Sequence, residues 1–223
     1  MSLFLYYITD RKQFSNDEAE ARRKLLERVE QCVELGIDAI QLREKDLDTK
    51  RLLELASEVA QLIQGRSSDP PTKQRTLLLI NSRSDLALAS NADGVHLRAD
   101  DISAADARAV WMSASAVAPV VAVSCHSAAE VDAAESNGAN FAVFGPVFGK
   151  RDIATPGTGL PRLESVCRKR QVANSTMPVL ALGGVTIDNA GSCIEAGAAG
   201  VAGISLFQSG NLRETIERLR NIR

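Results

Sequence analysis

Short apolar, β-branched runs alternate with longer amphipathic segments along the whole chain, and this alternation restricts its fold more than any other feature. Eight runs have the length and composition of buried strands: Leu3–Ile8, Ala39–Leu42, Thr76–Ile80, Gly94–Leu97, Val120–Val123, Phe141–Phe144, Val179–Leu182 and Gly200–Ala202. A helical pattern follows each run: Asp17–Leu35, Thr49–Gln64, Ser84–Ser90, Ser103–Trp111, Ser127–Asn137, Arg162–Arg170, Ile187–Ala196 and Leu212–Ile222. Eight strand–helix units predict an α/β protein with one domain, residues 1–223, folded as a single (β/α)8 TIM barrel.

Local signals at the ends of these segments support the helix predictions. Ser127 and Glu130 have the Ser-x-x-Glu spacing of a capping box, in which each side chain accepts a hydrogen bond from a first-turn amide. The helix after the fifth strand is therefore expected to begin at Ser127. Helix-terminating glycines precede three of the predicted strands, at Gly36, Gly138 and Gly197.

The charge composition argues against several classes of partner. Lys and Arg total 26 against 28 Asp and Glu, and no basic stripe or polybasic segment predicts binding of nucleic acid or of a membrane surface. No apolar run approaches the roughly 20 residues that span a bilayer. We therefore expect a cytoplasmic protein with a small-molecule partner, and a homodimer is one option for its assembly.

The cysteines do not predict a metal centre. They are far apart in the sequence and only two histidines accompany them, so buried free thiols are the expectation for Cys32, Cys125, Cys167 and Cys193.

Two predicted loops are longer than usual. Residues 65–75 join a helix to a strand, which places them on the N-terminal face of a barrel, away from the chemistry. Residues 148–161 follow a strand and therefore belong to the C-terminal face, where barrel enzymes build their active sites.

Polar residues that directly follow the strands are the site candidates in such a fold. They are Gln41, Arg43, Lys45, Asn81, His96, Asp101, Ser124 and His126. Gln41, Arg43 and Lys45 alternate and so share one side of an extended chain, where the two cations indicate an anion site. A salt-bridge ring of these cations with Glu44 and Asp46 is the alternative.

The two histidines differ in their expected roles. His96 lies inside a predicted strand, where packing in the core is favoured. His126 follows a strand and precedes a helix N-terminus, which favours the neutral ring that a general base requires. A purely structural role for His126 is the alternative.

Small residues end the last two strands, with Gly183 and Gly184 after the seventh and Gly203 and Ser205 after the eighth. Glycines let backbone amides approach an anion closely, and the loops after strands 7 and 8 commonly bind phosphate in this fold. The sequence therefore predicts a phosphate ester as substrate. Two tight turns without a ligand are the alternative.

Six segments, in order along nearly the whole chain, carry a family resemblance. They are Tyr7–Asp10, Gln41–Lys45, Ala92–Leu97, Val123–Ser127, Phe144–Phe148 and Leu182–Thr186. Together they resemble the thiamine phosphate synthase/TenI superfamily. The resemblance implies a barrel that holds the phosphate of a hydroxyethylthiazole phosphate on Gly183, Gly184 and the turn around Ser205.

This superfamily implies two chemistries. Synthases join a hydroxymethylpyrimidine pyrophosphate to the thiazole phosphate and release pyrophosphate, which calls for Mg²⁺ on carboxylates and a cationic pocket. The TenI branch moves protons around the thiazole to give its aromatic tautomer, with a positioned acid/base and no metal.

The sequence departs from the synthase pattern at functional places. Ser82 stands where the pattern implies a magnesium-binding Asp, whereas Asp101 keeps the second ligand position. The loop after the sixth strand offers Lys150 but lacks the hydroxyl spacing that grips pyrophosphate. Arg98 also replaces a residue that is usually small.

These departures favour a metal-free, TenI-like thiazole tautomerase with His126 as the acid/base and Gln41 and Lys45 beside it. The alternative is a Mg²⁺-dependent thiamine phosphate synthase in which Asp101 holds the metal. Its pyrimidine or second anionic group would then meet four polar residues, Arg43, Asn81, Ser124 and Lys150. A non-catalytic binder of thiazole or thiamine phosphate, and a barrel enzyme acting on a sugar phosphate, are further hypotheses.

Overall fold

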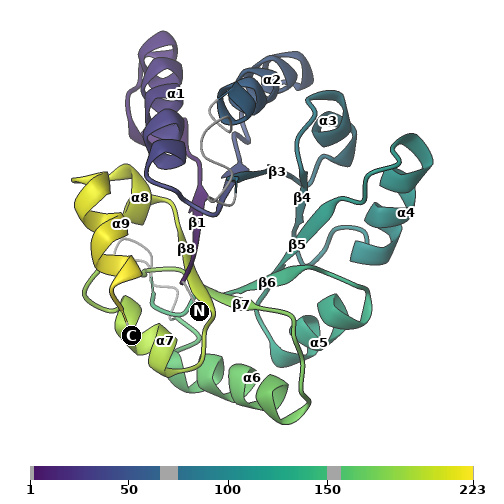
Figure 1. Cartoon of the computed structure of the whole chain (residues 1–223), viewed down its shortest axis with the longest axis vertical. Coiled ribbons are helices and arrows are strands. Elements are labelled where there is room, and N and C mark those ends of the chain that lie inside the picture. The colour runs from purple at the N-terminus through teal and green to yellow at the C-terminus, as the bar shows by residue number, and fades with distance from the viewer. Residues whose placement is uncertain (1–2, 66–74, 150–156, 223) are drawn as a thin grey trace.

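The computed structural model describes residues 3–65, 75–149 and 157–222, which form a closed barrel of eight parallel strands (Figure 1). The strands are β1 (Phe4–Ile8), β2 (Ala39–Leu42), β3 (Leu77–Asn81), β4 (Gly94–Leu97), β5 (Val120–Cys125), β6 (Phe141–Phe144), β7 (Val179–Leu182) and β8 (Gly200–Gly203). Each strand pairs with its neighbours in sequence, and β1 pairs with β8 to close the ring. The predicted (β/α)8 barrel is confirmed.

Helices surround the strands (Figure 1). The predicted ones are α1 (Glu18–Glu34), α2 (Thr49–Gly65), α3 (Ser84–Ala89), α4 (Ala104–Ala114), α5 (Ala128–Ser136), α6 (Leu160–Val172), α7 (Ala190–Glu195) and α9 (Leu212–Arg220). Helix α7 begins at Ala190 and not at Ile187, because the Asn189 side chain accepts a hydrogen bond from the Thr186 amide and holds the intervening residues in a turn. Two short elements are not predicted by the sequence, the 3₁₀ helix η1 (Arg11–Gln13) and α8 (Ser205–Gln208).

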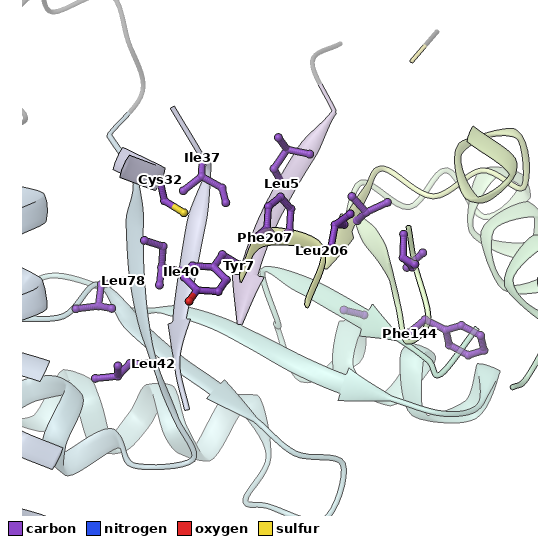
Figure 2. Packing of buried hydrophobic residues seen from close by; sticks show 14 of the residues in the cluster. Leu5, Tyr7, Cys32, Ile37, Ile40, Leu42, Leu78, Phe144, Leu206 and Phe207 are labelled. Atoms are coloured by element: carbon purple, nitrogen blue, oxygen red, sulfur yellow. The ribbon is translucent and has the colours of Figure 1, made fainter. Parts of the chain in front are cut away.

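Apolar side chains fill two layers, one inside the barrel and one between strands and helices. The inner layer comprises Tyr6, Ile8, Ala39, Leu79, Ala122, Phe141, Val143, Leu180 and Ala202. The alternate strand residues point outward into the larger cluster, where the rings of Tyr7 and Phe207 lie 6.2 Å apart (Figure 2). All four cysteines are buried and unpaired, as expected, and burial raises the pKa of Cys32 to about 12.

The caps form where they were expected, with one change of partner. The Ser127 hydroxyl accepts from the Glu130 amide at 3.2 Å, and α5 begins one residue later. The Glu130 carboxylate reaches back to the amide of His126, at 2.6 Å, instead of the amide of Ser127. Left-handed glycines end three helices, with φ of 75° at Gly36, 77° at Gly138 and 94° at Gly197.

Helix α8 is hydrogen-bonded to the segment that follows β1. The Gln208 side chain accepts from the Asp10 amide at 2.9 Å and donates to the Asp10 carbonyl at 3.0 Å. The Ser205 hydroxyl lies 3.3 Å from the Gln13 side chain in η1. These bonds join the segments that follow β1 and β8 at the C-terminal face. Within the described residues, no helix combines the length and apolarity needed to cross a membrane.

Candidate active site

Polar side chains replace apolar ones on the inner face of five neighbouring strands as these approach the C-terminal face. By strand alternation, the inward positions include Tyr6, Gln41, Asn81, His96 and Ser124, on β1 to β5 respectively. These side chains form two hydrogen-bonded chains, one through His96 and one through Gln41.

The first chain crosses the barrel from Tyr6 to Ser124. The Tyr6 hydroxyl lies 2.9 Å from Nδ1 of His96, and Nε2 of His96 lies 2.8 Å from the Ser124 hydroxyl. The His96 ring stacks on Tyr6, with centroids 5.7 Å apart. Burial, helped by the Arg43 cation, lowers the pKa of His96 to about 3, so its ring is neutral. This arrangement agrees with the core role expected for His96.

The second chain runs along the mouth from β2 to the segment after β4. Gln41 Nε2 donates to Asn81 Oδ1 at 2.9 Å, Asn81 Nδ2 donates to the Ser82 hydroxyl at 3.2 Å, and Ser82 donates to Asp101 Oδ2 at 2.6 Å. The Gln41 Oε1 atom is buried and accepts no hydrogen bond within the described part of the chain. An orphan acceptor is costly to bury, so it is suited to a ligand that donates.

Arg43 continues the inward alternation of β2 beyond Gln41. Its backbone amide donates to the Thr9 hydroxyl at 3.0 Å, which fixes the chain at the end of the strand. The guanidinium is half-buried and makes no ion pair or hydrogen bond with residues 3–65, 75–149 or 157–222. An unpaired, partly desolvated guanidinium favours an anionic ligand.

The acids beside Arg43 pair with another cation. Arg11 is buried and donates to Glu44 at 3.1 Å, to both oxygens of Asp46 at 2.8 Å, and to Glu18. These hydrogen bonds hold the pKa of Asp46 well below its usual range. The alternative in which Glu44 and Asp46 form a salt-bridge ring with Arg43 is therefore wrong.

A groove of about 340 Å³ lies beside the second chain. Its polar lining comprises Glu44, Lys45, Asn81, Ser82, Arg83 and Arg98. Arg83 is paired with Asp85 through two hydrogen bonds of 2.7 and 2.8 Å, and Glu44 is paired with Arg11. Lys45 is exposed at this groove, which places it near the end of the second chain.

Asp101 is the position that the sequence offers for Mg²⁺, but its carboxylate is already engaged. Oδ2 accepts from the Ser82 hydroxyl and, at 2.7 Å, from the Arg98 amide, and Oδ1 accepts from Arg98 Nε at 3.3 Å. Burial would raise the pKa of Asp101, but these donors lower it overall. The described residues contain no group of three or more His, Cys, Asp or Glu arranged for a metal. A lone carboxylate that faces a guanidinium does not fit a preformed Mg²⁺ site.

His126 lies exposed at the end of β5. Its Nδ1 contacts the Gly145 carbonyl, which can only accept, so Nδ1 must carry the proton. In the neutral ring Nε2 is then the unprotonated nitrogen, and it makes no hydrogen bond within the described ranges. This arrangement suits a general base.

The glycines after β7 lie against the loop after β6. Gly183 and Gly184 have φ of 93° and 66°, and an added Cβ would meet Pro146 at 2.5 Å and Phe148 at 2.7 Å. The turn therefore needs glycine for packing as well as for its backbone conformation. Neither glycine amide donates a hydrogen bond within the described residues, so both remain available to an anion.

The phosphate candidates after β8 stand next to this turn, because β7 pairs with β8. At Gly203, an added Cβ would meet Leu206 at 2.9 Å, and Ser205 begins α8. Lys150, the remaining candidate, lies outside the described residues. The structure therefore gathers the other candidates on one face, with the anion and acid/base groups on different strands.

Tyr6 and Arg11 are not among the residues that the sequence predicts for the site. Tyr6 carries a usable signal, since it shares the inward side of β1 with Phe4 and Ile8 and is the one of the three with a polar side-chain atom. Arg11 carries none, because a polar segment such as Asp10–Gln13 is normally exposed.

Comparison with known proteins gives consistent matches over nearly the whole chain. The sequence model of a family described as thiamine monophosphate synthase matches residues 5–207. A putative thiamine-phosphate synthase 2 of Aquifex aeolicus is 37% identical over 205 residues, which cover 91% of this chain and 96% of the relative. The thiamine-phosphate synthase of Clostridium novyi is 34% identical over 222 residues, covering 98% and 97%.

A solved structure agrees with these matches. The thiamine phosphate pyrophosphorylase of Pyrococcus furiosus is 30% identical and superposes with a TM-score of 0.76. The superposition covers 99% of this chain and 95% of that structure.

Proposed function

Because this chain belongs to the thiamine monophosphate synthase family, we propose that it joins hydroxymethylpyrimidine diphosphate to hydroxyethylthiazole phosphate and releases pyrophosphate. The names of the relatives favour this coupling over the tautomerase that the sequence analysis preferred. Within the site, the orphan acceptor of Gln41 beside the unpaired Arg43 carries the proposal. An aminopyrimidine diphosphate brings a donor and an anion, which are the two groups that these side chains lack.

The pyrimidine end of the substrate is assigned to the second chain. Gln41 Oε1 accepts from the exocyclic amine, and Asn81 holds the Gln41 amide in that orientation. Arg43 and Lys45 are assigned to the diphosphate, and Ser124 lies at the partly exposed end of the chain through His96. Lys150 is also assigned to the diphosphate, on its charge and its place in the sequence.

The thiazole phosphate is assigned to the turns after β7 and β8. The amides of Gly183 and Gly184 donate to no acceptor within the described residues, and the exposed Ser205 after β8 lies next to this turn. A phosphate placed there lies across β1 from Arg43, because β1 pairs with both β8 and β2.

The chemistry is the exchange of one bond for another. The bond between the pyrimidine methylene carbon and the diphosphate oxygen breaks, and its electron pair leaves on that oxygen. The thiazole nitrogen then gives its lone pair to the methylene carbon, and pyrophosphate is released. The cations at Arg43 and Lys45 stabilise the charge that develops on the leaving oxygen.

Mg²⁺ is the cofactor that the synthase hypothesis implied, with Asp101 as its ligand. Asp101 is held by Ser82 and Arg98, so no step of this proposal is assigned to a resident metal.

The test of the proposal is a two-substrate assay with purified protein. Thiamine phosphate and pyrophosphate should appear in equal amounts, and Arg43→Gln should lower the rate by about 100-fold through loss of leaving-group stabilisation. Arg51→Gln, on the outside of α2, is the matched control and should not change the rate. Absence of product with and without added Mg²⁺ would overturn the proposal.

The geometry of His126 favours a second candidate, the metal-free thiazole tautomerase. Its Nδ1 is fixed as a donor by Gly145, so its exposed Nε2 can take and return a ring proton. The Ser82 hydroxyl in place of a carboxylate points the same way. Aromatisation of the thiazole tautomer should then be accelerated in the presence of a chelator, and should be lost in His126→Gln. If that variant retained its full rate, the tautomerase would be excluded.

A further inference from the structure

The buried chain from Tyr6 through His96 to Ser124 has a direction that burial determines. Tyr6 is fully buried, and His96 Nδ1 is the one hydrogen-bond partner of its hydroxyl among the described residues. A buried hydroxyl proton without an acceptor is costly, so the Tyr6 O–H donates to Nδ1. The opposite arrangement, in which Nδ1–H donates to Tyr6, would leave the tyrosine proton with no acceptor.

The state of the His96 ring follows from this first bond. Burial lowers the pKa of His96 to about 3, so the ring is neutral and carries one proton. Burial also raises the pKa of Tyr6 well above its usual value, so the phenol keeps its proton. Because Nδ1 accepts, the ring proton must sit on Nε2, 2.8 Å from the Ser124 hydroxyl oxygen.

The Ser124 hydroxyl therefore receives a hydrogen bond from His96 and keeps its own proton for another partner. Ser124 is half-buried and has no partner other than His96 among the described residues. We propose that Tyr6 and His96 are positioning residues that make Ser124 an obligatory hydrogen-bond donor to the bound substrate.

This inference rests on the proposed function only in that the substrate carries a heterocycle and phosphate groups. The atom opposite Ser124 must be an acceptor, which means an unprotonated ring nitrogen or a phosphate oxygen. Gln41 has the opposite requirement, since its orphan Oε1 accepts. The inner wall thus selects a ligand with both a donor and an acceptor, as an aminopyrimidine has.

The first experiment reads the tautomer directly in the full chain. The protein has two histidines, so a two-bond ¹H–¹⁵N correlation spectrum of histidine-labelled protein contains two ring patterns, and His126→Gln assigns them. His96 should show the Nε2–H tautomer in wild type. Tyr6→Phe should release Nδ1 and produce a mixture with Nδ1–H. An Nδ1–H tautomer in wild type would overturn the proposal.

The adjacent tyrosine provides a matched control. Tyr7 is also fully buried, but it points to the helix layer and its hydroxyl has no hydrogen-bond partner among the described residues (Figure 2). Tyr7→Phe removes a tyrosine hydroxyl from the neighbouring position of β1 and should leave the His96 tautomer unchanged.

The second experiment asks whether Tyr6 acts through Ser124. Calorimetric titration with hydroxymethylpyrimidine diphosphate should show Kd raised about tenfold in Ser124→Ala and by a smaller factor in Tyr6→Phe. The double variant should have the same Kd as Ser124→Ala. If the increase in its Kd equals the product of the increases in the two single variants, Tyr6 does not act through Ser124. Tyr7→Phe should bind as wild type does.

Two further ligands separate the outcomes. If inorganic pyrophosphate loses affinity in Ser124→Ala, the acceptor is a phosphate oxygen; if it does not, the acceptor is a ring nitrogen. Either result supports a donor role. If no pyrimidine diphosphate binds to wild type, the proposed function fails, but the tautomer spectrum and a titration with hydroxyethylthiazole phosphate still decide the role of Ser124.

Discussion

The hydroxyl of Ser82 donates a 2.6 Å hydrogen bond to the carboxylate of Asp101, so this side chain occupies an oxygen that a metal would otherwise use. Arg98 completes this arrangement with its amide and its guanidinium. The relationship explains why a family member can retain Asp101 without displaying a magnesium site.

Ser82→Asp should therefore create affinity for Mg²⁺. The new carboxylate would face Asp101, and Asp tolerates the left-handed φ of 58° at this position. Without metal the two like charges should lower the unfolding free energy by about 1 kcal/mol, and saturating Mg²⁺ should restore it. Calorimetric titration with MgCl₂ measures the affinity, with Ser113→Asp on the exposed side of α4 as the control. Tight binding of Mg²⁺ by wild type would contradict this account of Asp101.

Arg11→Ala should be strongly destabilising. It would leave Glu44, which is 3% exposed, as an uncompensated buried acid and would remove one of the two cations that pair with Asp46, the other being Lys12. The expected loss is about 3–5 kcal/mol of unfolding free energy at pH 7, measured by urea denaturation. Arg51→Ala, which breaks an exposed pair with Asp48, should cost less than about 1 kcal/mol. Equal losses in the two variants would mean that burial of the Arg11 network is unimportant.

Stability should fall as pH drops from about 7 to about 5, and His96 should contribute to that fall. The folded pKa of His96 is about 3 and the unfolded value is near 6.5, so the unfolded state binds more protons between these limits. This group contributes stability that is present above pH 6.5 and is lost toward pH 3. Between pH 7 and pH 5 the loss is about 2 kcal/mol.

The contribution of His96 is isolated by comparing unfolding free energies at the two pH values in His96→Gln and in wild type. His96→Gln should be less stable than wild type at pH 7. Its loss of unfolding free energy between pH 7 and pH 5 should be about 2 kcal/mol smaller than the loss in wild type. His126→Gln, at the exposed mouth, is the parallel histidine control. An unchanged pH dependence in His96→Gln would show that the ring titrates normally.

Gly183→Ala should damage both folding and phosphate binding, because the new Cβ would overlap Pro146 and the residue has a φ of 93°. A destabilisation of about 1–3 kcal/mol is expected, with weaker binding of inorganic phosphate. Gly191→Ala is the matched control: this glycine lies in α7 with open space around it, so alanine should stabilise by up to about 1 kcal/mol. Phosphate affinity that survives in Gly183→Ala would place the phosphate elsewhere.

The sequence was sufficient for the barrel because strand and helix periods repeat strongly, whereas short elements escape such analysis. The four residues of α8 span little more than one turn, too few to show a period. Site residues could be named because they follow strands, but their hydrogen bonds could not. Tyr6 and His96 are 90 residues apart, and only the closed ring brings them into contact.

The same limit applies to charge. The alternative hypothesis from the sequence was that Glu44 and Asp46 would balance Arg43 and Lys45, which are their immediate neighbours. Strand alternation instead directs Arg43 inward, while Glu44 meets Arg11 on the other side of the chain. Because adjacent residues of an extended chain point to opposite sides, Glu44 pairs with Arg11, and Arg43 remains available to a ligand.

The pairing of β1 with β8 also has a consequence for how the chain folds. Phe4 lies opposite Gly200, so the last seam of the ring joins segments separated by almost the entire sequence. Such a contact carries the largest loop-closure entropy in the molecule, whereas each strand–helix–strand unit is local. Assembly should therefore proceed through open sheets of successive units, with the seam formed late. Until it forms, the edges of β1 and β8 are exposed to pairing with other chains, which makes dilution during refolding favourable for yield.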